Sequence, residues 1–211
     1  MGKTYRFYDQ KQSLLLSPNI KDWLPQGHLA LFISDIVDEL DLTPIYSYYE
    51  KEDRGAPPYD PRMMTKVLFY AYATGIQSSR KIEKKQVEDI GFRYLTANNF
   101  PNFRTISDFR KHHIDTLEHL FVQVLLLCEE AGLVKLGTVA VDGMKVKANA
   151  SLQNSKQYKT LCDLEEELRK KVRELLQGAE QIDEEEDRLF GEDKRGDELP
   201  PGFQSQKERL Q

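Results

Sequence analysis

The sequence has few of the features that mark membrane or secreted proteins. It contains two cysteines in 211 residues, Cys128 and Cys162, and they form no CxxC pair, so the disulfide framework of a small secreted protein is excluded. No apolar run reaches the roughly 18 residues of a membrane-spanning helix. The first ten residues, MGKTYRFYDQ, contain no apolar signal-peptide core. We therefore expect a cytoplasmic protein without a membrane partner.

Several common catalytic motifs are also missing. The sequence has no P-loop, no GxGxxG pattern and no GxSxG pattern, and we expect no small-molecule substrate. Three histidines lie near one another, at positions 112, 113 and 119. His112 and His119 are about two helical turns apart and therefore too distant to hold one metal ion easily. A polar helix face is the favoured interpretation.

Charge is distributed unevenly along the chain. The net charge is −5 overall, but residues 161–211 contain 16 acidic and 9 basic residues, a net charge of −7. Residues 1–160 contain 21 basic and 19 acidic residues, a net charge of +2. Any nucleic-acid binding must therefore depend on local basic patches in the first 160 residues.

Apolar residues at helical spacing predict a helical domain of four to six helices over residues 28–132, after an irregular segment at 1–27. Asp60-Pro61 is a favourable helix start and Gly75 a favourable helix end. A further helix should begin at Ser78 or Ser79, so two helices meet at a short turn that contains glycine. This arrangement is a helix-turn-helix candidate.

Two groups of residues are candidates for binding DNA. The second helix of the helix-turn-helix candidate carries Arg80, Lys81, Lys84 and Lys85. The start of a later helix carries Arg104, Ser107, Arg110 and Lys111. Backbone N–H groups at a helix start favour phosphate, and a serine there could lie near a base edge. Composition alone favours a solvated helix face for the first group, and the second group alone is weak evidence for DNA binding.

The next two segments differ from the domain before them. Residues 133–160 read as a β-hairpin, with alternating valines and the turn dipeptide Asp142-Gly143. Lys145 and Lys147 follow on the returning strand, and an aspartate at this place is most often only a turn residue. Residues 161–211 form an acidic helical insertion, which begins with a long amphipathic helix. Its apolar seam consists of Leu161, Leu164, Leu168, Val172 and Leu175.

These motifs together resemble a known family. The segment TVAVDGMKVKANAS, residues 138–151, is similar to the one that holds the first catalytic aspartate in DDE transposases of insertion sequences. The upstream part resembles their InsH-type N-terminal domain. The residues that carry this second likeness are Pro61, Gly75, Ser78, Ser79, Arg80, Ile82, Glu83, Phe92, Arg93, Tyr94, Leu95, Thr105, Ile106, Ser107, Phe109 and Arg110.

The resemblance implies a fold and a chemistry. The N-terminal helices would bind double-stranded DNA at the element's terminal inverted repeats, and a ribonuclease-H-like domain would begin at the strand that carries Asp142. In the family this aspartate joins a second aspartate and a glutamate to bind Mg²⁺ or Mn²⁺, which activates the nucleophile in phosphodiester cleavage and strand transfer. Those two partners are missing from this sequence.

We therefore expect a mainly α-helical, truncated transposase that binds DNA, is associated with the bacterial nucleoid and is catalytically incomplete. Bound metal is not expected. Two alternatives stay open. The first is a non-catalytic DNA-binding regulator of transposition. The second is a helical interaction protein that forms a homodimer through the seam of residues 161–177.

Overall fold

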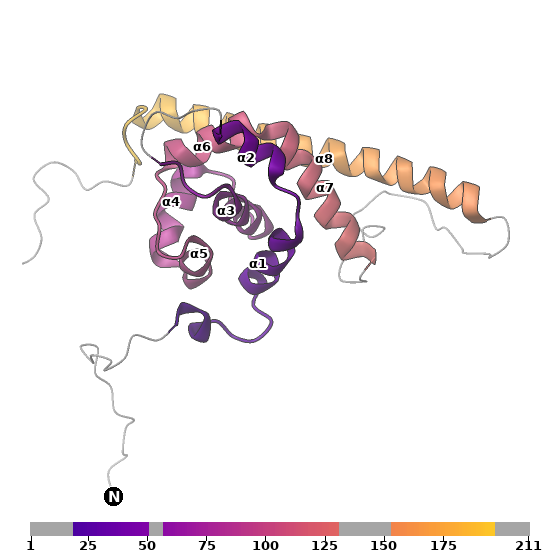
Figure 1. The fold of residues 1–211 in the computed structure, drawn as a ribbon. Helices are drawn as coiled ribbons and strands as arrows, with labels where there is room; N and C mark the ends of the chain where they lie inside the picture. Colours follow the sequence, from indigo (N-terminus) through magenta and orange to yellow (C-terminus); the bar gives the residue numbers. More distant parts are fainter. Residues whose placement is uncertain (1–18, 51–56, 131–152, 197–211) are drawn as a thin grey trace, which may run out of the picture.

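The computed structural model of the chain describes residues 19–50, 57–130 and 153–196 (Figure 1). Its elements are η1 (Ile20–Trp23), α1 (Leu29–Glu39), α2 (Thr43–Tyr49), α3 (Pro61–Ala73), α4 (Ser79–Glu88), α5 (Ile90–Thr96), α6 (Phe103–His112), α7 (Ile114–Glu130) and α8 (Gln153–Phe190). None of these helices is both long enough and apolar enough to cross a membrane.

The predicted fold class needs a correction. Within the three described ranges all regular structure is helical and there is no strand, so a fold with a β-hairpin that opens a ribonuclease-H-like domain is contradicted. The predicted turn at Asp142 lies outside the described residues. Residues 153–160, predicted to belong to the hairpin segment, form the first turns of α8 instead. Their sequence, QNSKQYKT, is rich in glutamine and lysine, which favour helix over strand.

Helix α3 lies at the centre of the described bundle and packs mainly against α1 and α5. Met64, Val67 and Leu68 are almost completely buried, as the apolar character of this helix predicts. Asp60 caps its start by accepting hydrogen bonds from the backbone N–H groups of Arg62 and Met63. At its end Gly75 has a φ of +77°, a conformation in which glycine is favoured.

The helical pattern of the sequence from Thr105 to Gly132 predicts one helix, but its described part belongs to two, α6 and α7. The first, α6, begins earlier, with Asn102 as its cap, and ends before His113. The His113 side chain is buried, with its ring 4.9 Å from that of Phe109 and 5.5 Å from that of Tyr49. Packing against α2 therefore accompanies the break, and no helix-breaking residue marks it in the sequence.

Helix α8 is longer than predicted and is packed within the chain. It continues through the acidic residues as far as Phe190 and contacts α7, α6 and α4 in turn (Figure 1). Leu168, Val172 and Leu176 are buried in the common core. Arg173 pairs with the buried Glu118 and, at 3.1 Å, with Asp115, both on α7. The described part of the apolar seam is thus covered by the chain's own α7.

Truncating a side chain on the buried face of α8 should destabilise the single chain. We expect Leu176→Ala to lower the free energy of unfolding by about 2–5 kcal/mol, because Leu176 is fully buried and the cavity would be only partly filled. Urea denaturation measures this. The matched control is Leu189→Ala on the same helix, where the side chain is 75% exposed and the expected change is below about 0.5 kcal/mol. A midpoint that rises with protein concentration would instead favour dimerisation through the seam.

Candidate functional site

The exposed lysines of α4 form one continuous face. Ser78 caps the helix, and its Oγ accepts a hydrogen bond from the Lys81 backbone N–H at 3.1 Å. Lys81, Lys84 and Lys85 follow at spacings that place side chains on one side of a helix. The opposite side is buried: Ile82 lies in the core, while Gln86 is fully buried. We call Lys81, Lys84 and Lys85 the lysine face.

Neighbouring carboxylates neutralise the lysine face only weakly. Glu88 lies 3.1 Å from Lys85 Nζ and 3.9 Å from Lys84 Nζ, and all three side chains are more than 40% exposed. Exposed pairs of this kind contribute roughly 0.3–0.5 kcal/mol and are screened by salt. Lys84 and Lys85 can therefore exchange Glu88 for an external anion at little cost in free energy.

Arg110, another predicted DNA-binding residue, is completely buried. Its Nη2 donates to Oδ2 of Asp183 at 2.5 Å and to Ser107 Oγ at 3.4 Å. Asp183 also accepts hydrogen bonds from the backbone N–H of Ser79, at 2.8 Å, and from its Oγ, at 2.6 Å. Burial opposes the charge on Arg110, but the charges and hydrogen bonds of Tyr72 and Asp183 outweigh it and raise the pKa of the guanidinium.

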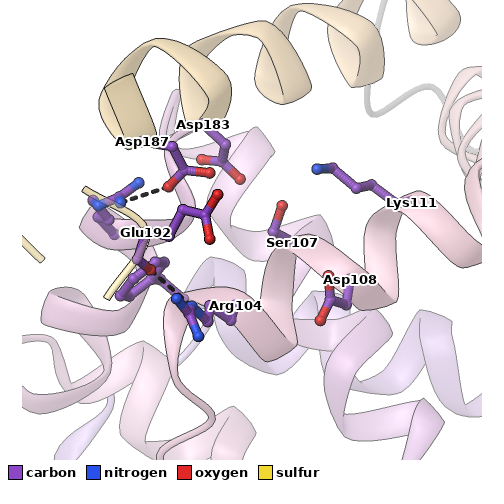
Figure 2. Close-up of a pocket in the computed structure, with 9 residues that line it drawn as sticks. Arg104, Ser107, Asp108, Lys111, Asp183, Asp187 and Glu192 are labelled. Atoms are coloured by element: carbon purple, nitrogen blue, oxygen red, sulfur yellow. Dashed lines mark hydrogen bonds and ion pairs between the residues drawn. The ribbon is translucent and has the colours of Figure 1, made fainter. Parts of the chain in front are cut away.

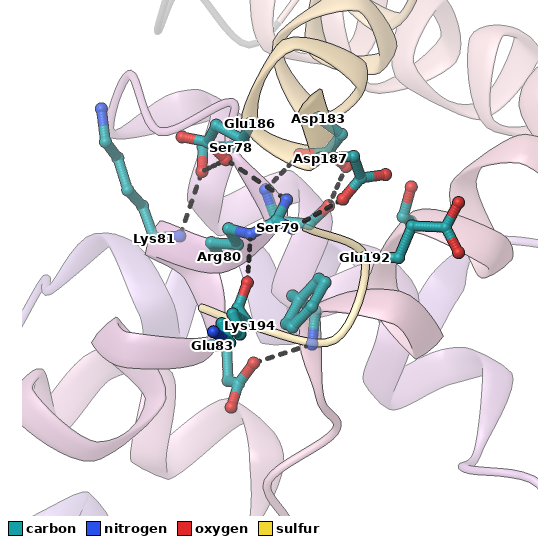
Figure 3. A network of polar contacts seen from close by, with 12 residues as sticks. Ser78, Ser79, Arg80, Lys81, Glu83, Asp183, Glu186, Asp187, Glu192 and Lys194 are labelled. Carbon is teal, nitrogen blue, oxygen red and sulfur yellow. Dashed lines mark hydrogen bonds and ion pairs between the residues drawn. The ribbon is translucent and has the colours of Figure 1, made fainter. Parts of the chain in front are cut away.

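Arg80 is also buried and is held by the C-terminal end of α8 (Figure 3). Its Nη2 donates to Asp187 Oδ1 at 2.6 Å and to the carbonyl oxygen of Gly191 at 2.9 Å. Its Nε donates to the carbonyl oxygen of Lys194 at 2.9 Å, and its guanidinium lies 4.3 Å from the centre of the Phe103 ring. Nη1 is buried and has no hydrogen-bond partner.

A small cavity of about 160 Å³ lies between α6 and the end of α8 (Figure 2). Its lining mixes charges of both signs and consists of Arg80, Phe103, Arg104, Ser107, Asp108, Lys111, Asp183, Asp187 and Glu192. At its edge Arg104 donates to the carbonyl oxygen of Glu192 at 2.7 Å and pairs with Asp193 at 2.6 Å. The cavity is polar and lies at the contact of the basic α6 with the acidic end of α8.

The predicted site residues thus separate into three groups. Lys81, Lys84, Lys85, Arg104 and Lys111 have side chains that reach solvent. Arg80, Ser107 and Arg110 are buried in contacts with or beside α8. Asp142, Lys145 and Lys147 lie outside the described residues. In the described ranges, no group of three or more histidine, cysteine, aspartate or glutamate side chains could hold a metal ion.

Sequence reasoning missed the acidic residues that complete this network. Glu186 and Asp187 follow Asp183 by three and four residues, so both lie on the same face of α8 as Asp183. The sequence alone predicts only an acidic helical insertion for this segment. Its regular acidic spacing, together with the net positive charge of residues 1–160, was the signal that could have indicated an internal partner.

Comparison with known proteins gives one result. Residues 18–112 match the family model Transposase domain (DUF772). The match runs from the residues just before η1 to the end of α6, and so contains the lysine face as well as Arg80, Arg104 and Arg110. This match supports the view that the chain is a member of a transposase family. No curated protein and no solved structure gave a match.

The Arg110–Asp183 pair should be strongly coupled. We expect Arg110→Ala and Asp183→Ala each to lower the free energy of unfolding by about 3–5 kcal/mol, because each leaves a buried charge without its partner. The double variant should lose less than the sum of the two. A double-mutant cycle in urea measures the coupling, and the exposed pair Lys171–Glu167 is the control, with at most about 0.5 kcal/mol. Strictly additive effects would contradict the proposed pairing.

Stability should also depend on His113. Burial, with a smaller effect of His112, lowers the pKa of His113 below its ordinary value of 6.5. Just below pH 6.5 the unfolded chain therefore binds more protons at this histidine than the folded chain does. The contribution of His113 to the free energy of unfolding is thus complete above pH 6.5 and is lost as the pH falls below that value. Denaturation at several pH values should show that His113→Gln flattens this dependence, whereas His119→Gln, at an exposed position, leaves it unchanged. An identical pH dependence in both variants would exclude His113 as the cause.

Proposed function

We propose that the chain is a DNA transposase component whose described helical bundle binds double-stranded DNA at the terminal inverted repeats of an insertion sequence. The observation that carries this proposal is the lysine face, three exposed cations on a capped helix within the segment that matches the transposase domain. Each lysine that neutralises a phosphate releases condensed counterions, which is the main source of affinity for a duplex.

The geometry favours contacts to the phosphate backbone over reading of bases. Ser107, predicted to lie near a base edge, is 8% exposed, and its Oγ accepts a hydrogen bond from Arg110. Backbone contacts fix the position of a protein on a duplex but carry no sequence information. The proposal therefore assigns the sequence-independent part of binding to α4.

In this proposal Asp142 is the first of the three metal-binding carboxylates of a DDE transposase of the InsH type, and it would not support strand cleavage by itself. Only a complete set of three carboxylates would hold the Mg²⁺ or Mn²⁺ that activates the nucleophile. Asp142 lies outside the described residues. Lys145 and Lys147 would then lie near the substrate phosphates.

The structure bears on the two alternative functions unequally. A non-catalytic regulator would bind DNA through the same lysine face, so the described residues do not distinguish it from a transposase. A helical interaction protein would need the seam of residues 161–177 for a second copy. Leu168, Val172 and Leu176 are buried within the chain, which favours DNA binding over that role.

The lysine face can be tested by the salt dependence of binding. A duplex that carries the element's terminal repeat is titrated with the chain in gel-shift assays at about 50 and 200 mM salt. For the triple variant Lys81→Gln, Lys84→Gln, Lys85→Gln we expect weaker binding and a slope of log K against log salt that is smaller by about 2–3, because each phosphate contact contributes about 0.9.

The control variant changes the same number of exposed cations elsewhere. Arg169, Lys170 and Lys171 lie on the solvent side of α8 and pair with glutamates of their own helix. Their replacement by glutamine should leave the slope nearly unchanged. Equal losses in both triple variants would show a non-specific charge effect, and no retardation of the duplex by any form of the chain would refute DNA binding.

A further inference from the structure

We propose that the acidic end of α8 occupies a second phosphate-binding site of the bundle and competes with DNA for it. This inference rests on the proposed function, since it concerns the same ligand. The site consists of Ser78 Oγ at the start of α4 together with Arg80 and Arg104, whereas the donors of Ser79 stay bound to Asp183. DNA would reach it only when the last turn of α8 and residues 191–195 move away.

The pocket has the chemistry of an anion site. Ser78 Oγ donates to Glu186 Oε2 at 2.7 Å, and the Ser79 backbone N–H and Oγ both donate to Asp183 (Figure 3). Unpaired N–H groups at a helix start, two serine hydroxyls and nearby guanidinium groups are the donors that bind phosphate oxygens. Here carboxylate oxygens of the same chain accept from them.

The carboxylates do not use every donor of the pocket. Arg80 is only 3% exposed, yet its buried Nη1 has no hydrogen-bond partner. Oε2 of Glu186 lies 4.0 Å from it. An arginine that binds phosphate typically donates two parallel hydrogen bonds. A phosphate group can therefore satisfy a donor that α8 leaves unsatisfied.

The contact between the acidic end of α8 and the bundle has a buried part and a more exposed part. Asp183 is buried, with 5% of its side chain exposed, and pairs with Arg110. Further along, the side chain of Asp187 is 38% exposed and that of Asp193 is 87% exposed. Solvent and salt screen the outer pairs. The outer part can thus separate from Arg80 and Arg104 while Asp183 keeps α8 attached to the bundle.

Removing the outer charges should open the site. We expect the variant Glu186→Gln, Asp187→Asn to bind the same terminal-repeat duplex about tenfold more tightly than the wild-type chain does. The salt slope should increase by about 2, because Arg80 and Arg104 would each gain a phosphate contact. Adding Arg104→Gln to this variant should remove about half of that increase. Circular dichroism and urea denaturation check that each variant is folded.

The matched control has the same change in net charge at the same end of α8. Glu184 and Glu185 are exposed neighbours of Glu186, and neither lines the cavity. We expect Glu184→Gln, Glu185→Gln to bind with nearly wild-type affinity and slope. An equal increase in affinity in both variants would mean that α8 acts only through long-range charge repulsion. No increase in either would mean that the end of α8 stays permanently in contact with the bundle. Both results overturn the competition.

A second measurement follows the movement of α8 itself. When the duplex is added to the wild-type chain, hydrogen exchange should become faster for amides of the last turn of α8 and residues 191–195. Binding that leaves this exchange unchanged would overturn the competition while keeping the proposed function. Failure of the wild-type chain and of all variants to bind the duplex would refute the proposed function itself. The two ideas can therefore fail separately.

Discussion

The described structure depends on the buried pair of Arg110 and Asp183, which joins three helices at one point. Arg110 comes from α6, Asp183 from α8, and the Ser79 hydrogen bonds bring in the start of α4. Two desolvated charges are tolerated because Asp183 accepts three short hydrogen bonds, while Arg110 also lies within reach of Tyr72 and Ser107. This pair fixes how the acidic helix lies on the basic part of the bundle.

Much of the helical bundle could be predicted because its signals are local. Asp60-Pro61, Gly75 and Ser78 mark helix ends by their own backbone preferences, and the structure has helix ends at these places. The break at His113 could not be predicted, because it accompanies packing against Tyr49, 64 residues away in the sequence. The prediction of a β-hairpin over residues 133–160 was wrong for residues 153–160, which form the start of α8.

The candidate site was predicted less well than the fold. A basic residue on an amphipathic helix is normally solvated, so the exposure of Lys81, Lys84 and Lys85 agrees with expectation. Arg80 and Arg110 are buried by contacts with α8, and their partners Asp187 and Asp183 lie 107 and 73 residues further along the chain. Their pairing requires tertiary contacts that no local pattern reveals. Several residues that carry the family resemblance, such as Ser79, therefore have a structural role in holding α8.

The separation of these partners along the chain has a consequence in time. Synthesis proceeds from the N-terminus at about 5–20 residues per second, and Asp183 follows Arg110 by 73 residues. For roughly 4–15 seconds at these rates, a growing chain has made α4 and α6 but not the carboxylates that cover them. Each newly made molecule thus passes through an interval in which its arginines have no internal partner and the nearest polyanion can reach them first.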